Sequence, residues 1–269
     1  MRDAYYCGDG EKGDIEKLTI NLFFDGEKSA VKHPGRQALE TFLGALVNNN
    51  AGIYLRKDVE AVEGLLIRAI SYAIDNGFDE SGRNGFDPKE GYSFTDTQLD
   101  AALSSHPTAQ RFLNAVQSRQ ERSQLTSVAS IRYRDCGWLV RADYKDVLVV
   151  EATDPQIDEL NRNVTLRKLI QLEKRLCTEL GLTPEELVIT SSPQTDRLVV
   201  ENPQIAIVNG GKTQFKGVFD PDVSPELKAR LDRKLRQQFS FEFITRANGS
   251  DKVRRYLESA DPVQLLLSA

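Results

Sequence analysis

The sequence predicts an α+β fold in which antiparallel sheets, arranged as hairpins and a meander, pack with amphipathic helices. Several segments repeat apolar residues at the spacing of a helix, whereas others alternate apolar and polar residues at the period of a strand. The two kinds of segment occur in clusters rather than in strict strand–helix–strand alternation, which favours α+β over α/β. A chain of 269 residues can bury a core as one large domain or as two small ones.

The first half, residues 1–125, is predicted to be an N-terminal α+β region. Residues 18–24 alternate like a strand, and the Asp-Gly pair that follows makes this strand half of a hairpin. Two amphipathic helices come next, one beginning at Pro34 and the other at Asp58. A loop rich in glycine and aspartate, residues 76–94, separates them from two further helices.

The second half, residues 126–269, is predicted to be a C-terminal α+β region that begins with an antiparallel meander. Gly181 is expected to end a long helix that starts at Asp154, and Thr183 to cap a short one. The expected strands are residues 131–133, 138–142, 147–150, 198–200, 205–208, 215–219 and 240–245, and the later helices are residues 225–239 and 251–259.

Cysteine and histidine are too few for most metal and nucleophile chemistry. Cys7, Cys136 and Cys177 are odd in number and far apart, so neither a disulfide framework nor a thiolate metal site is indicated. His33 and His106 each directly precede a proline, which is typical of the start of a helix. A Ser-His-Asp or Cys-His site would need one of these two histidines as its base. We therefore expect no cofactor.

The chain lacks the sequence features of a membrane protein. No apolar run approaches the roughly 20 residues that a membrane-spanning helix needs, and the N-terminus has no apolar core of the kind found in signal peptides. A cytoplasmic location is therefore expected.

Gly211, Lys212 and Thr213 follow an apolar strand, as they would in a phosphate-binding loop. The first glycine of such a loop is replaced by Ala206, and the residues after Thr213 have the pattern of a strand where the loop requires a helix. The segment is better explained as a hairpin that turns at Asn209 and the glycine after it.

The same segment, residues 202–213, resembles the VNGGQT signature of abortive-infection phage-resistance proteins. It ends in Val-Asn-Gly-Gly-Lys-Thr, with Lys212 in place of the glutamine, and Ala206 and Ile207 interrupt the spacing. The resemblance implies a role in antiviral defence.

The loop 76–94 contains a candidate site for a hard cation. Asp79, Asp87 and Glu90 supply carboxylates, and Glu90 is the twelfth residue counted from Asp79, as in a calcium-binding loop. An arginine occupies one ligand position, however, and the sixth position is not glycine. The alternative is a flexible loop without a metal.

A restriction-type nuclease is a second chemical possibility. Such an enzyme places an acidic residue and then Glu-x-Lys around one Mg²⁺. Asp143 and Glu151 could supply the carboxylates, but Thr153 occupies the position of the lysine, so Lys145 would have to reach in from a neighbouring turn. The alternative is that Glu151 is only a charge at the end of a strand.

The clearest signal is the distribution of charge. The formal net charge is -5, yet residues 226–258 contain nine basic and five acidic residues, a local charge of +4. In the helix 225–239, Leu227, Leu231 and Leu235 form an apolar stripe and leave the basic residues on the opposite face. Such a face can contact phosphates or an acidic partner, or can simply be solvated. The candidate binding residues are Lys228, Arg230, Arg233, Lys234, Arg236, Arg254 and Arg255.

Exposed aromatic rings would strengthen the case for single-stranded nucleic acid. Phe239, Phe241 and Phe243 alternate as a strand does, which predicts that they point into a core. They therefore do not predict a stacking platform.

The leading hypothesis is a non-enzymatic intracellular protein that binds a nucleic acid or an acidic protein surface as part of a larger assembly. One alternative is the Mg²⁺-dependent nucleic-acid-processing enzyme, and another is a structural subunit of a particle. In an assembly, Leu265, Leu266 and Leu267 could insert into a neighbouring subunit, whereas otherwise they complete the core of their own chain.

Overall fold

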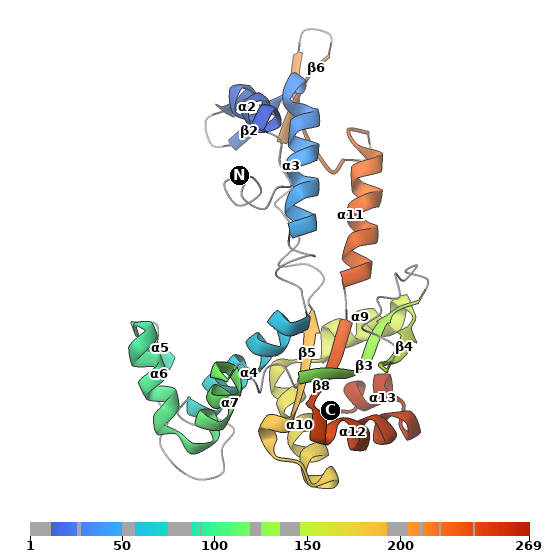
Figure 1. Ribbon diagram of the computed structural model, residues 1–269. Helices are drawn as coiled ribbons and strands as arrows, with labels where there is room; N and C mark the ends of the chain where they lie inside the picture. The colour runs from blue at the N-terminus through green and yellow to red at the C-terminus, as the bar shows by residue number, and fades with distance from the viewer. Residues whose placement is uncertain are drawn as a thin grey trace. The chain divides into compact units, whose positions relative to one another are not determined.

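The α+β class is confirmed, since the described residues form helices and two four-stranded sheets (Figure 1). Each sheet contains two antiparallel strand pairs and one parallel pair. The computed structural model describes residues 12–25, 28–49, 57–74, 88–91, 93–118, 125–134, 146–192, 204–209, 212–220, 222–238 and 240–269.

The contacts within the chain divide it into two compact units. Unit 1 comprises Met1–Arg56 and Pro193–Phe239, and unit 2 comprises Lys57–Ser192 and Ser240–Ala269. Each unit combines segments from both of the regions predicted from the sequence, and residue 125 lies inside unit 2. Pairing between strands that are far apart in the chain produces this division, and local patterns carry no information about such pairing.

The sheet of unit 1 consists of two hairpins joined by a parallel pair. Its strands, in order across the sheet, are β1 (Leu22–Asp25), β2 (Lys28–Lys32), β6 (Gln204–Asn209) and β7 (Lys212–Gly217). The predicted hairpin at Asn209 is confirmed, because β6 and β7 are antiparallel with Asn209 opposite Lys212. A strand, not a helix, therefore includes Thr213, which excludes the phosphate-binding loop.

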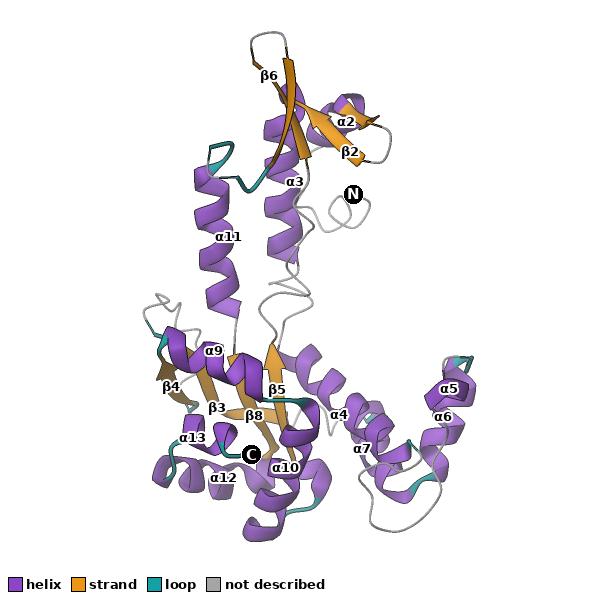
Figure 2. Cartoon of the chain, turned by 180° about the vertical axis from the view of Figure 1, so that it is seen from behind, coloured by secondary structure: helices purple, strands orange, loops and turns teal. Residues whose placement is uncertain are grey.

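The described part of unit 1 also contains three α-helices, of which α3 and α11 run side by side (Figures 1 and 2). The helical elements are α2 (Lys12–Asn21), the 3₁₀ turn η1 (His33–Gly35), α3 (Arg36–Asn49) and α11 (Pro225–Gln238). They enclose a core to which α2 contributes Leu18, α3 contributes Leu39 and Leu43, and α11 contributes Leu227.

One local prediction in unit 1 is wrong. The strand expected over residues 18–24 begins only at Leu22, and residues 18–21 end the helix α2. Leu18 lies in the core, while Thr19 Oγ1 donates a hydrogen bond to the Ile15 carbonyl one turn earlier. The alternating pattern is too short to distinguish helix from strand, and the burial of Leu18 in the core favours the helix.

Unit 2 is built on the second sheet, whose strands come from distant parts of the chain. The order across the sheet is β4 (Leu148–Ala152), β3 (Leu125–Tyr133), β8 (Ser240–Arg246) and β5 (Leu187–Ser192). The predicted meander differs from this order, because β4 pairs directly and in parallel with β3. The strand expected between them, residues 138–142, lies outside the described residues.

Helices pack against the strands of this sheet, as Figure 2 shows from behind. The helical elements described in unit 2 are α4 (Lys57–Ala73), α5 (Pro88–Gly91), α6 (Asp96–Ser105), α7 (Pro107–Gln117), α9 (Asp154–Asn163), α10 (Leu166–Leu180), the 3₁₀ turn η4 (Pro184–Glu186), α12 (Ala247–Ser259) and α13 (Pro262–Leu267). In the described part of the chain, no helix is long and apolar enough to cross a bilayer.

Several helix ends lie where the sequence predicts them. His106 caps α7 by accepting a hydrogen bond from the Ala109 amide at 3.4 Å, with a proline at the first turn. Gly181 ends α10 in the left-handed conformation with φ of 63°. The long helix expected from Asp154 is divided in two, because Thr165 caps a second helix by accepting a hydrogen bond from the Lys168 amide.

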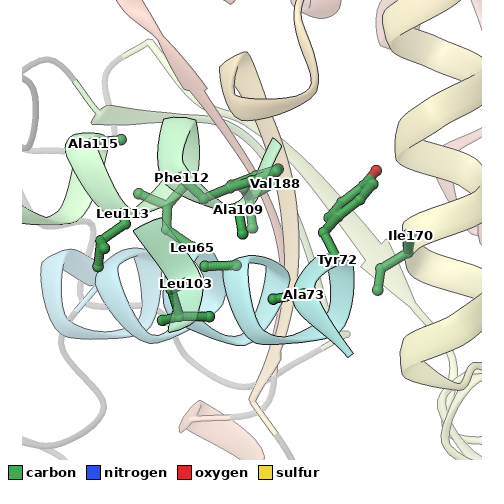
Figure 3. Packing of buried hydrophobic residues seen from close by; sticks show 11 residues of the cluster. Leu65, Tyr72, Ala73, Leu103, Ala109, Phe112, Leu113, Ala115, Ile170 and Val188 are labelled. Carbon is green, nitrogen blue, oxygen red and sulfur yellow. The ribbon is translucent and has the colours of Figure 1, made fainter. Parts of the chain in front are cut away.

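The helices α4, α6, α7 and α10 bury a common core against β5 (Figure 3). Tyr72 of α4 stacks on Phe112 of α7 with their ring centroids 5.5 Å apart, and the Lys174 ammonium lies 5.2 Å from the centre of the Tyr72 ring. Gly64 permits close approach of α4 to the sheet, since a Cβ atom there would lie 2.8 Å from a methyl group of Thr190. The fit of α4 on β5 therefore depends on this glycine.

The C-terminal leucines belong to α13, which packs against α9 and β4 of its own unit. Leu266 is fully buried, while Leu265 and Leu267 are half-buried. The Asp261 side chain caps this helix by accepting hydrogen bonds from the amides of the next turn.

A buried ion pair joins α4 and α10 to the outer edge of the sheet in unit 2. Arg68 forms a bidentate contact with Glu173, with Nη2 2.6 Å from Oε1 and Nε 3.2 Å from Oε2. Arg68 also donates to the Ile189 carbonyl at 2.7 Å, and the Ile189 amide donates to Glu173 at 2.7 Å. Burial raises the pKa of Glu173, although Arg68 and the Ile189 amide act in the opposite direction.

Cys177 of α10 is a buried thiol. Its Sγ lies 3.5 Å from the Thr183 carbonyl, to which it donates. Burial raises the pKa of Cys177 to about 12, and the charges of Glu173, Glu186 and Glu185 contribute to the increase. This thiol is therefore protonated at neutral pH and is a weak nucleophile.

Replacing Glu173 with leucine leaves the Arg68 guanidinium buried without its carboxylate, so we expect the free energy of unfolding to fall by about 3 to 5 kcal/mol. Breaking the exposed Arg254–Glu258 pair with Arg254→Ala should cost less than about 1 kcal/mol. Urea-induced unfolding followed by circular dichroism measures both changes. Adding Arg68→Met to Glu173→Leu should recover part of the loss, and equal losses in the two single variants would contradict the assigned role.

In the native protein we expect Cys177 to resist alkylation by iodoacetamide near neutral pH, because almost none of the thiol is ionised there. The pKa in the folded state lies above the ordinary value of 9.0, so the contribution of this thiol to stability is complete below about pH 9 and is lost as the pH rises towards 12. Peptide mass spectrometry compares native with urea-unfolded protein, and similar alkylation of Cys177 in both would disprove the expectation.

Candidate functional site

The helix α11 begins after a turn that is held by local hydrogen bonds. The Asp222 amide donates to the Asp220 side chain at 3.0 Å, and the Ser224 amide donates to the Asp220 carbonyl. Lys216 of β7 lies 3.1 Å from the Asp222 carboxylate, and this hydrogen bond raises the pKa of Lys216. Pro225 then occupies the first turn of the helix.

The core of unit 1 fixes the orientation of α11. Leu227, the first leucine of the predicted stripe, is buried against α3 and the sheet. Lys228, Arg233 and Arg236 of the same helix are exposed. The side chains of Arg230 and Lys234 lie outside the described residues, although both residues belong to α11. With five basic and two acidic residues, the helix has a formal charge of +3.

The other two predicted binding residues lie on α12, which belongs to unit 2. Arg254 Nε lies 3.0 Å from Glu258 Oε1 one turn later, whereas Arg255 is exposed. Lys252 Nζ donates to the Leu180 carbonyl at the end of α10 at 3.3 Å. Two basic residues of α12, Lys252 and Arg254, are therefore bonded to groups of unit 2. The predicted binding residues that belong to unit 1 are all on α11.

The division into units changes how the charge is distributed. Unit 1 contains 15 basic and 14 acidic residues, a formal charge of +1, whereas unit 2 contains 20 and 26, a formal charge of -6. The acidity of the chain thus belongs to unit 2. Unit 1 is nearly neutral overall, and α11 concentrates positive charge within it.

The structure places few of the candidate nuclease residues. Glu151 lies on β4, is exposed, and pairs in register with Arg132 of β3. Asp143 and Lys145 lie outside the described residues. A site formed by these three residues therefore stays a prediction.

The candidate cation loop is described only at its end. Glu90 belongs to the short helix α5, whereas Asp79 and Asp87 lie outside the described residues. Among the residues that are described, no three His, Cys, Asp or Glu side chains gather as metal ligands would.

Sequence patterns did not predict a polar cluster that lies buried between β3 and β8. Ser130 donates to Glu242 Oε1 at 2.7 Å, and Arg132 Nη2 donates to the same oxygen at 3.0 Å. Ser127 donates to the other carboxylate oxygen, and Arg132 Nε also contacts Ser130 Oγ. Both oxygens of Glu242 are therefore occupied, and the side chain is only 1% exposed.

For the other buried ion pair, Arg68–Glu173, the sequence does contain a signal. Arg68 stands between Leu65 and Tyr72 on the apolar stripe of α4, and Glu173 follows Leu172 on the buried side of α10. A charged residue on an apolar stripe needs a partner, because an unpaired buried charge is costly. Glu242 gives a weaker signal, since it alternates with Phe241 and Phe243 as an exposed residue of a one-sided strand would. The predicted burial of these two phenylalanines is confirmed.

Comparisons with known proteins describe the fold and not the function. No protein-family profile matches the sequence, and no curated protein matches it. A hypothetical protein from Aquifex aeolicus, with a crystal structure at 2.0 Å, superposes with a TM-score of 0.53 at 16% sequence identity. The match covers 95% of this chain and 55% of that one, so this chain spans about half the length of its structural neighbour. At this identity, the similarity shows a shared fold alone.

Proposed function

We propose that this chain is a non-enzymatic intracellular binding protein that contacts a nucleic acid or an acidic protein surface through α11, as part of a larger assembly. The supporting observation is the exposure of Lys228, Arg233 and Arg236 on a helix whose Leu227 is held in the core of unit 1. A fixed helix with a basic outer face attracts anionic partners and orients them without a covalent step. A role in antiviral defence is a narrower form of this proposal, whereas a structural subunit of a particle is an alternative to it.

The α-helix α12 is a less suitable contact surface for the same partner. Arg254 is paired with Glu258, and the rest of unit 2 carries an excess of acidic residues. Negative charge in the same unit reduces the attraction of an anionic partner. We therefore assign the contact to α11 and not to α12.

Reversing the charge of Arg233 and Arg236 to glutamate should weaken binding of an anionic partner by on the order of tenfold to a hundredfold at low salt. Raising the salt concentration from about 50 to about 200 mM should weaken binding by the wild type steeply. It should weaken binding by the variant less, because the variant neutralises fewer phosphates and so releases fewer counterions. Fluorescence anisotropy measures both, with a labelled single strand of about 20 nucleotides, a duplex and polyglutamate as probes.

The matched control reverses Arg254 and Arg255 to glutamate, which changes the charge of the chain by the same amount. We expect at most a small loss of affinity in this variant, because α12 is not the contact. If both double variants lose affinity equally, net charge and not α11 governs binding. Unchanged affinity of the Arg233/Arg236 variant for all three probes would contradict the proposal.

The nuclease alternative is tested directly. We expect no Mg²⁺-dependent hydrolysis of a labelled nucleic acid and no effect of a chelator on binding. Hydrolysis that Asp143→Ala abolishes would overturn the non-enzymatic proposal. Asp146→Asn, an exposed acidic residue just before β4, is the matched control, since it removes a nearby charge without touching the candidate site.

A further inference from the structure

Unit 1 presents a second feature, a pair of phenylalanines on one face of its sheet. Residues directly opposite each other on paired strands share a face. Phe23 of β1 is opposite Ala30 of β2. Two residues further along β2, Lys32 is opposite Ala206 of β6. On its other side, Ala206 is opposite Phe215 of β7. These five residues therefore share a face, which we call the open face.

The other face of this sheet is covered by the core of unit 1. Val31 and Ile205 are buried there, together with Leu18 of α2, Leu39 of α3 and Leu227 of α11. The three helices described in unit 1 thus pack on the side opposite the open face.

Small residues in the centre of the open face allow the two rings to meet. β1 and β7 are the edge strands, yet the ring centroids of Phe23 and Phe215 are only 6.1 Å apart, with 40° between the planes. Ala30 and Ala206 on the two central strands are 1% and 6% exposed. Phe215 remains 40% exposed, and Lys32, which lies two strands away on the same face, is also exposed.

We infer that the open face is a stacking platform for the bases of a single-stranded nucleic acid. Exposed aromatic rings on four-stranded sheets stack unpaired bases, and nearby cations bind the phosphates between them. Phe215 supplies the exposed ring, the half-buried Phe23 lies next to it, and Lys32 supplies the cation. This inference rests on the proposed function, whose partner it narrows to single strands.

Charge favours a nucleic acid over an apolar protein as the occupant. An exposed lysine lies on the same face as the rings, and the unit that carries them also carries the basic helix α11. A purely apolar partner would instead suit Ile20 and Phe24, which are 76% and 74% exposed. Phe24 adjoins Phe23 in the chain and lies on the opposite face of β1, so it provides a matched control.

The test compares oligothymidylate of about 20 nucleotides with an abasic oligomer of the same length, which has the phosphates without the bases. The wild-type chain should bind the oligothymidylate more tightly than the abasic oligomer or a duplex. Phe215→Ala and Phe23→Ala should weaken binding of the oligothymidylate by on the order of tenfold to a hundredfold and leave abasic binding unchanged. Phe24→Ala should change neither.

A conservative variant separates stacking from damage to the fold. Phe215→Trp keeps an aromatic ring, so it should bind as the wild type does, and the fluorescence that it adds should be quenched by oligothymidylate. The inference would be overturned if Phe215→Ala bound oligothymidylate with wild-type affinity. It would also be overturned if Phe24→Ala lost as much affinity as Phe215→Ala, or if the wild-type chain bound no oligothymidylate.

The two proposals fail in different ways. If the Arg233 and Arg236 reversals weaken binding of all the oligomers while Phe215→Ala has no effect, α11 binds phosphates and the open face is not a platform. If Phe215→Ala weakens binding while the reversals do not, the platform stands and the role of α11 is disproved.

Discussion

The fold of unit 2 depends on the Arg68–Glu173 ion pair, because it ends the sheet. β5 is an edge strand that pairs with β8 on one side. On its other side, the amide and carbonyl of Ile189 bond to Glu173 and Arg68 instead of to another strand. An open edge can pair with other chains, and covering it removes that possibility. The same two side chains anchor α4 and α10, so one interaction fixes two helices and closes the sheet.

Local features of this fold could be predicted from the sequence, whereas strand partners could not. The helix starts near Pro34 and Pro107 and the helix end at Gly181 follow from the chemistry of single residues. β5 had no predicted counterpart, and β8 lies between β3 and β5, from which it is separated by about 110 and 50 residues of chain. The choice of partner depends on burial against distant segments, which a local window does not contain.

The candidate site shows the same division between what is local and what is distant. The leucine stripe and basic residues of α11 are visible as a pattern within one helix, and Leu227 and Arg233 lie as that pattern predicts. The grouping of Arg254 with them rested on nearness in the sequence, and the chain places it in the other unit. Phe23 and Phe215 are almost 200 residues apart, so no periodicity could associate them.

The basic residues are distributed differently in the two units, which under the proposal is why a mildly acidic chain would suit an anionic partner. In unit 2, Arg68, Arg132 and Arg254 each bind a carboxylate of their own unit, two of them in its interior. Their charge is neutralised within the fold, and acidic residues dominate what remains. In unit 1, Arg36 and Lys216 are paired as well, but α11 carries a charge of +3 and exposes Lys228, Arg233 and Arg236. Net charge averages these two situations, although only exposed charge acts on a partner.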